Sequence, residues 1–291
     1  MSPESSPTDL FHWPPRQIDE QPGTAPPPPP PSISPIERLI DSIETDLLGR
    51  VGLSFDRWAS RNQWAPDALD TFCWRCAGNV GPHEQDGEGC AACRATRLPW
   101  DRAMRLSAYK DEIRREVLAL KFKAWRPGGR ALGSMLGQLI RKQIDHSQIP
   151  VSSARIVPIP MHPLRRIRRG VDHTEVLAKA ASASSGIRIC KALRALHRPE
   201  QIGLSSTARA RNMKNAFRGR PKAIHDAIRK NRAPVRVWVL IDDVRTTGAT
   251  FTAASKALRS GISPKRGQGS ETAIWVCSVG VAQGRNRREA M

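Results

Sequence analysis

Long apolar runs are missing from this sequence of 291 residues: no stretch approaches the roughly 18 consecutive apolar residues that a membrane span needs. The first residues also lack the order of a basic and then an apolar segment that marks a secretory signal. We therefore expect a soluble, cytoplasmic protein without membrane insertion. Cysteine is scarce, with six residues, and a chain without an export signal is not expected to carry a disulfide framework.

Aromatic and acidic residues are also few. The chain has one Tyr and six Phe, partly offset by eight Trp, which counts against a dedicated stacking platform for single-stranded nucleic acid. Lys and Arg outnumber Asp and Glu by 47 to 27, a net charge of +20. Residues 1–100 hold 8 basic and 14 acidic residues, a net of −6, so the remainder carries +26. Such a basic body favours polyanionic partners, either phosphorylated metabolites or nucleic acid.

Proline is concentrated at one end, since residues 1–35 contain 12 of the 24 prolines. This composition predicts a disordered or polyproline II tail. Ser34 and Glu37 then have the spacing of a capping box, which predicts the start of a helix. The expected organisation is a proline-rich tail at 1–35, an N-terminal helix with a small cysteine-containing module at 36–100, an α/β domain at 101–283 and a basic tail at 284–291.

Two CxxC pairs account for four of the cysteines. They are Cys73, Cys76, Cys90 and Cys93. Each pair places two thiolates on one tight knuckle, and two knuckles complete a tetrahedral zinc site. Because all four ligands are sulfur, no position is left for a catalytic water, and we predict a structural zinc ion. His83 is a weaker candidate ligand, and Cys190 and Cys277 are expected to be buried thiols.

Strand and helix patterns alternate after residue 100, which predicts a parallel α/β sheet. Pro127-Gly128-Gly129 is expected to separate the first two helices. The predicted helices span about 109–123, 131–145, 174–183, 207–215 and 252–259, and the predicted strands span 155–159, 187–190, 238–241 and 273–279.

Residues 238–250 read WVLIDDVRTTGAT and are the most informative stretch. An apolar run typical of a buried strand ends at the paired acids Asp242 and Asp243. These acids can accept hydrogen bonds from vicinal ribose hydroxyls, while a Thr/Gly loop at a helix N-terminus can hold a phosphate. The predicted phosphate loop consists of Thr246, Thr247, Gly248, Ala249 and Thr250. An ordinary strand–turn–helix with solvated aspartates is the alternative.

Four arginines follow the strand at 155–159 within five positions, namely Arg165, Arg166, Arg168 and Arg169. In an open α/β sheet, ligands bind beyond the carboxyl ends of the strands. The planar fork of arginine suits phosphate and pyrophosphate oxygens. We predict that Arg165 and Arg169 contact a phosphate or pyrophosphate; a solvated basic loop or a nucleic-acid patch is the alternative.

The order of these segments resembles that of a known family. Over roughly residues 70–280, the motifs occur in this order: a double CxxC, YKxxIR, LKF, VPIPMH, RRG, QxGL, RxxN and LIDDVxTTGAT. This arrangement is similar to the ComF-like phosphoribosyltransferase family, which is associated with natural competence and DNA uptake. The resemblance implies a type I phosphoribosyltransferase fold, a Rossmann-like parallel sheet, behind an N-terminal zinc-binding module.

The resemblance also implies a donor, phosphoribosyl diphosphate (PRPP), with Mg²⁺ bound alongside it. Asp242 and Asp243 would be the catalytic pair on the ribose hydroxyls, and residues 246–250 would hold the 5′-phosphate. Lys121 falls in the LKF motif, Gln201 in QxGL, and Arg209 and Asn212 in the helix that follows. The implied acceptor is an unidentified nitrogen, and the implied partners include single-stranded DNA or proteins of the competence machinery.

Two departures from the family pattern leave the function open. Val171-Asp172-His173 stands where an aromatic residue, Asn and Gln are usual, and Arg198 stands where Thr is common. One interpretation is a PRPP-dependent transferase. A second is a non-catalytic protein that handles single-stranded DNA and uses the fold as a nucleotide-binding scaffold, motivated by the net +11 of residues 161–220. A third is a degenerate transferase kept as an interaction module.

Overall fold

The fold was analysed in a computed structural model, which describes residues 55–122, 125–162, 171–196, 215–230, 233–262 and 272–282. Several sequence-based predictions lie outside these residues. They concern the proline-rich tail, the helix from Ser34, the arginine loop with Arg165 and Arg169, the segment with Gln201, Arg209 and Asn212, and the basic C-terminal tail.

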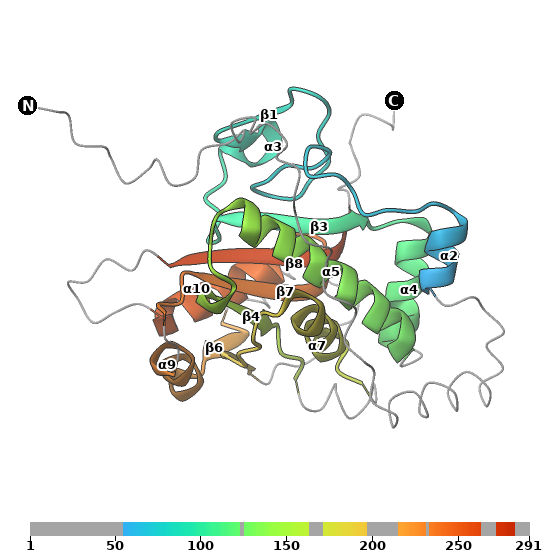
Figure 1. Cartoon of the computed structure of the whole chain (residues 1–291). Helices are drawn as coiled ribbons and strands as arrows, with labels where there is room; N and C mark the ends of the chain where they lie inside the picture. Colours follow the sequence, from blue (N-terminus) through green and yellow to red (C-terminus); the bar gives the residue numbers. More distant parts are fainter. Residues whose placement is uncertain are drawn as a thin grey trace, which may run out of the picture.

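A four-stranded parallel sheet forms the centre of the molecule (Figure 1). Its strands, in spatial order, are β3 (Arg102–Ala108), β8 (Ala273–Val281), β7 (Val237–Arg245) and β4 (Ala154–Pro158). Every neighbouring pair is parallel. The prediction of a parallel α/β fold is confirmed, and the arrangement is consistent with a type I phosphoribosyltransferase-like core.

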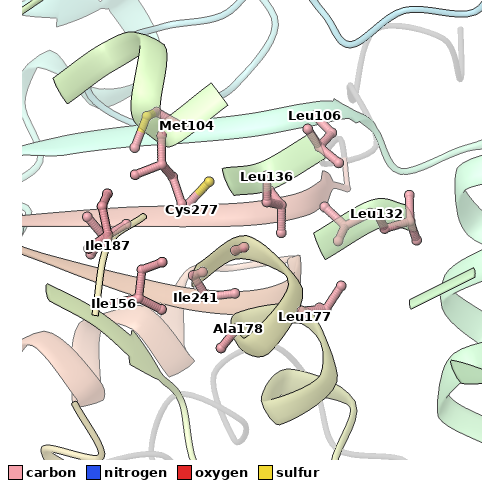
Figure 2. Close-up of a cluster of buried hydrophobic side chains, with 14 of the residues drawn as sticks. Met104, Leu106, Leu132, Leu136, Ile156, Leu177, Ala178, Ile187, Ile241 and Cys277 are labelled. Carbon is pink, nitrogen blue, oxygen red and sulfur yellow. The ribbon is translucent and has the colours of Figure 1, made fainter. Parts of the chain in front are cut away.

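Residues of β7 alternate between two apolar cores, because successive side chains of a strand point to opposite faces of the sheet. Val239 and Ile241 pack into the core beneath the helices α4 (Asp111–Phe122), α5 (Arg126–His146) and α7 (His173–Ser185). Figure 2 shows this core, with Ile241 of β7 and Cys277 of β8 near Leu136 of α5 and Leu177 of α7. Trp238 and Leu240 pack into the opposite core with α10 (Ala249–Ile262).

The helices α5 and α7 approach each other closely because α5 carries glycines at the contact. A Cβ atom added at Gly133 would lie 2.6 Å from the backbone oxygen of Leu177. Any larger residue there would force the two helices apart. The helix α5 also begins earlier than predicted: Pro127 lies in its first turn, where a missing N–H costs no hydrogen bond. Pro127-Gly128-Gly129 therefore starts α5 instead of preceding it.

The opposite face of the sheet carries smaller elements around α10. The hairpin of β5 (Leu193–Ala195) and β6 (Phe217–Gly219) is antiparallel, and α9 (Pro221–Arg229) follows it. None of these elements was predicted. The predicted strand at 187–190 is wrong, because only Ile189 pairs there, in a single bridge with Ile156. The short 3-10 helix η2 (Val151–Ser153) leads into β4.

The cysteine module lies beside β3, which is one of the two edge strands of the sheet (Figure 1). It contains β1 (Gln85–Asp86), β2 (Gly89–Cys90) and α3 (Ala91–Arg94). The helix α2 (Phe55–Arg61) precedes it and packs through Phe55 against the core of α4 and α5. Among the helices that the structure describes, none combines the length and apolar character that crossing a membrane requires.

Candidate functional site

The paired acids Asp242 and Asp243 lie near the carboxyl end of β7, in the middle of the parallel sheet. The strand does not stop at them as predicted, because pairing with β8 continues to Arg245, opposite Val281. Both acids are buried, with exposed fractions of 8% and 3%. The alternative of solvated aspartates is therefore wrong. Two buried carboxylates at the carboxyl end of parallel strands need partners or a ligand.

Asp243 has two partners, which come from different helices. Its Oδ2 atom lies 2.9 Å from Nζ of Lys121, in the last turn of α4. The same oxygen lies 2.8 Å from Nε2 of His173, the first residue of α7. The structure thus brings the LKF motif to the Asp-Asp pair. It also places His173, a departure from the family pattern, in direct contact with the catalytic candidate.

His173 is held in place by the start of α7. The side chain of Asp172 caps this helix and accepts a hydrogen bond from the backbone N–H of Glu175 at 3.2 Å. The hydroxyl of Thr174 donates to the backbone oxygen of Ile159, just beyond β4. In the sequence, Asp172 and His173 stand out only as substitutions in the family pattern, and no contact is predicted for them. The signal that was present is a capping residue followed by a histidine at a helix start.

The pKa values of the two acids move in opposite directions. Burial, and then the charge of Asp243, raise the pKa of Asp242 to about 7. Burial also acts to raise the pKa of Asp243, but the close contact with His173 and the charges of His173 and Lys121 outweigh it and lower that pKa to about 2. Near neutral pH the pair therefore carries one firm negative charge, on Asp243, and one that titrates, on Asp242.

We predict that Asp242→Asn raises the thermal stability of the ligand-free protein at pH 8. The folded-state pKa of Asp242 exceeds the ordinary value of 3.8, so the free energy of unfolding of the wild type falls as the pH rises from about 4 to 7. Asparagine cannot ionise, so the variant does not lose this free energy. The melting temperature should rise by several degrees at pH 8, at about 2–4 °C per kcal/mol, and hardly change near pH 4. Thermal denaturation across this range measures the effect, and an unchanged or lower melting temperature at pH 8 contradicts it.

The predicted phosphate loop connects β7 to α10. Thr246 and Thr247 are exposed, whereas Gly248 is buried and has a φ of +79°. This left-handed conformation suits glycine, which has no Cβ atom. The hydroxyl of Thr247 accepts a hydrogen bond from the N–H of Ala249 at 3.3 Å, and α10 starts at Ala249, one residue before Thr250. The loop therefore presents two reachable hydroxyls at the positive end of a helix, as a phosphate site requires.

The four cysteines Cys73, Cys76, Cys90 and Cys93 converge in the module, and all four are buried. Three of the Sγ–Sγ distances are 3.7 Å, and the four sulfurs lie within 4.8 Å of one another. Zinc–sulfur bonds of about 2.3 Å give a tetrahedron with edges of about 3.8 Å, so these sulfurs fit one zinc ion. A disulfide would need a separation of about 2.0 Å.

Backbone and side-chain hydrogen bonds support this centre. The N–H of Cys90 donates to Sγ of Cys73 at 3.3 Å, and the N–H of Gly78 donates to Sγ of Cys76 at 3.4 Å. Such donors favour the thiolate, the form that binds metal. The guanidinium of Arg75, in the first knuckle, donates to the backbone oxygens of Cys93 and Thr96 at 2.9 Å each. Arg75 thereby joins the two knuckles.

Comparison with known proteins identifies bacterial relatives. No protein-family model matches the chain. "Competence protein F" of Haemophilus influenzae is 30% identical over 192 residues, which cover 65% of this chain and 78% of that protein. "DNA utilization protein YhgH" of Salmonella typhi is 29% identical over 178 residues, covering 58% and 70%, and that of Escherichia coli K12 is 27% identical over 184 residues with the same coverage.

Proposed function

The chain belongs to the ComF-like family, and from this premise we propose that it binds PRPP and transfers the 5-phosphoribosyl group to a nitrogen acceptor, with release of pyrophosphate. The observation that carries the proposal is the juxtaposition of two buried carboxylates, Asp242 and Asp243, with the exposed threonines of the loop at 246–248. The names of the relatives support a role related to competence and DNA utilization.

In the proposed complex, the loop at 246–250 holds the 5′-phosphate through the hydroxyls of Thr246 and Thr247 and the N–H groups at the start of α10. Asp242 and Asp243 accept hydrogen bonds from the ribose 2′- and 3′-hydroxyls. Asp243 can do so as an anion at any pH above about 4, because His173 and Lys121 keep its pKa low. The donor is thereby fixed at two ends of the same sugar phosphate.

The proposed reaction breaks the bond between the anomeric carbon and pyrophosphate and forms a bond from that carbon to the acceptor nitrogen. The electron pair of the broken bond leaves with pyrophosphate, and the nitrogen loses a proton. Positive charge develops on the ribose ring, and the buried carboxylates of Asp242 and Asp243 stabilise it electrostatically. The remaining contribution is alignment of the donor by its phosphate and hydroxyls.

We propose that Mg²⁺ binds together with PRPP and is not bound by the protein alone. Ligand atoms of His173, Asp242 and Asp243 lie within 4.8 Å of one another, so the chemistry of the set allows a divalent cation. However, Oδ2 of Asp243 already has Lys121 Nζ at 2.9 Å as a cationic partner. Mg²⁺ keeps several waters and is usually bound by one or two carboxylates and the substrate's phosphates, where it neutralises their charge. Asp242 and Asp243 would hold it only when PRPP is present.

Isothermal titration with PRPP and Mg²⁺ tests the binding step. We expect heat from the wild type, and affinity at least about tenfold lower for Asp242→Asn and for Asp243→Asn, since each loses a charge-assisted hydrogen bond to the ribose. Asp226→Asn is the matched control, because Asp226 lies on α9 in a surface pair with Lys230 at 3.8 Å. Absence of heat from the wild type, or equal heat from all four proteins, contradicts the proposal.

A second candidate function is binding of single-stranded DNA, favoured by the names of the relatives and by the net charge of +20. Phosphate contacts would make the affinity fall steeply with salt, so that log K is linear in log salt concentration. A titration of single-stranded DNA across salt concentrations measures this slope. A steep slope that PRPP does not alter supports a separate DNA surface, whereas competition by PRPP assigns the binding to the phosphate loop.

A further inference from the structure

We propose that Trp100 is a positioning residue which couples the zinc centre to the phosphate loop, so that phosphate affinity depends on the bound metal. The inference rests on the proposed function, since the phosphate in question is that of PRPP. Trp100 lies between the second knuckle and β3, and only 4% of it is exposed. Its indole contacts the loop at one end and the first knuckle at the other.

At the loop end, the indole supports Gly248 from inside the protein. A Cβ atom added at Gly248 would lie 3.4 Å from Cη2 of Trp100 and 3.4 Å from Nε of Arg245. The backbone of Gly248 is thus bounded by an aromatic ring and a guanidinium, while Thr246 and Thr247 beside it are exposed. The ring therefore supports the buried side of the loop and leaves the threonine hydroxyls to the ligand.

The same ring also contacts the first turn of α10. The centroids of Trp100 and Phe251 lie 6.3 Å apart with an interplanar angle of 66°, an edge-to-face arrangement. Phe251 is buried, at 1% exposure, two residues after the start of the helix. Trp100 thus contacts both parts of the predicted phosphate site, the glycine turn and the helix start. A shift of the indole would displace both together.

At the other end, Nε1 of Trp100 donates a hydrogen bond to the backbone oxygen of Arg75 at 2.9 Å. Arg75 lies between Cys73 and Cys76, inside the first knuckle. Its guanidinium reaches the backbone oxygens of Cys93 and Thr96, around the second knuckle. The two knuckles together therefore fix the position of the Arg75 backbone oxygen, which accepts the indole N–H. In the proposal, the zinc ion bound by the four sulfurs holds the two knuckles together.

Loss of the ion releases this carbonyl and leaves a buried indole N–H without its partner. An unpaired buried donor is unfavourable, so the ring is expected to reorient toward another acceptor or toward water. The left-handed turn at Gly248 then loses the surface on which it packs. The expected result is a loop that samples several conformations and binds phosphate more weakly, because ordering it again opposes binding.

Titration calorimetry with ribose 5-phosphate, which needs no added Mg²⁺, tests the coupling before and after treatment with a zinc-selective chelator. We expect the wild type to lose about tenfold in affinity when zinc is removed. Trp100→Phe should lose a similar factor while it retains one zinc ion per chain, and zinc removal should then add little. Trp275→Phe is the matched control, since Trp275 is buried in the core beneath α4, α5 and α7, on the other side of the sheet from Trp100, and should change melting temperature but not affinity.

The inference is overturned if Trp100→Phe binds ribose 5-phosphate with wild-type affinity. It is also overturned if the affinity losses from the mutation and from zinc removal add in full, because coupled sites give non-additive effects. If Trp100→Phe does not fold, Arg75→Ala replaces it: this variant keeps the ligands and the indole, and unchanged affinity with zinc bound again overturns the inference. If the wild type binds PRPP and Trp100→Phe has wild-type affinity, the inference fails but the proposed function stands. A wild type that binds neither PRPP nor ribose 5-phosphate overturns both.

Discussion

Replacing Cys90 with serine should abolish zinc binding and unfold the cysteine module. Cys90 is one of the four predicted zinc ligands, and its backbone N–H donates to Sγ of Cys73. Its replacement would remove one bond to the metal and leave three thiolates to repel one another. Structural zinc sites contribute on the order of 10 kcal/mol or more in small zinc-binding peptides. The module has a small core made of the four cysteines with Val80 and Leu98 against them, which cannot replace that contribution.

Metal analysis of the purified protein measures this effect directly. The wild type should contain one zinc ion per chain and Cys90→Ser none, and limited proteolysis should cleave the variant between residues 73 and 93. Cys190→Ser is the control: Cys190 is equally buried, lies outside the cluster and donates to the backbone oxygen of Ala223, which a serine hydroxyl can also do. A wild type without metal, or a Cys90→Ser variant that keeps its zinc, contradicts the prediction.

Replacing Lys121 with methionine should produce the largest loss of stability from a single change in the candidate site. Methionine has nearly the same shape, but it leaves the buried Asp243 with His173 as its one remaining partner in the described structure. Removing one member of a buried ion pair costs about 3–5 kcal/mol, and the 21% exposure of the Lys121 side chain favours the lower end of that range.

The pH dependence of this loss has a definite sign. Because Lys121 helps to lower the pKa of Asp243 below its ordinary value, its contribution is present above about pH 4 and disappears as the pH falls toward 2. Chemical denaturation at pH 7 and at low pH measures the difference. The double variant Lys121→Met/Asp243→Asn should recover most of the stability. Lys179→Met is the control, since that exposed lysine pairs with Glu175 at 3.7 Å and should change stability by about 0.5 kcal/mol or less. An equal effect of the two lysine variants contradicts the prediction.

The strongest local patterns predicted their structures correctly. The apolar run before Asp242 is a central strand, and the two CxxC pairs converge, because both features are encoded within short stretches. The strand β3 was missed for the opposite reason. Arg105 interrupts its apolar pattern yet is buried at 2%, since Asp67 pairs with it at 2.7 Å and the backbone oxygen of Ala77 accepts its second hydrogen bond. The free-energy cost of burying this guanidinium is offset only by partners that are distant in the sequence.

The contacts of the candidate site were less predictable than its residues. Asp243 was identified from its motif, but its partners Lys121 and His173 come from helices far along the chain. No periodicity relates three segments that meet only after the sheet has formed. Trp100 shows the same difficulty, because its importance comes from what it contacts at Arg75 and Gly248 and not from a pattern around it.

The position of β3 at the sheet edge has a consequence for synthesis of the protein. Its only partner strand in the described sheet is β8, with Arg102 opposite Trp275, about 170 residues later. At ribosomal rates of about 5–20 residues per second, the synthesis of β8 follows that of β3 by on the order of ten to thirty seconds. The four clustered cysteines all precede β3, and the backbone oxygen of Trp74, in the first knuckle, accepts the N–H of Ala103 at 2.8 Å. The first knuckle therefore offers the nascent strand a hydrogen-bonding neighbour during the interval in which an unpaired edge is prone to aggregate.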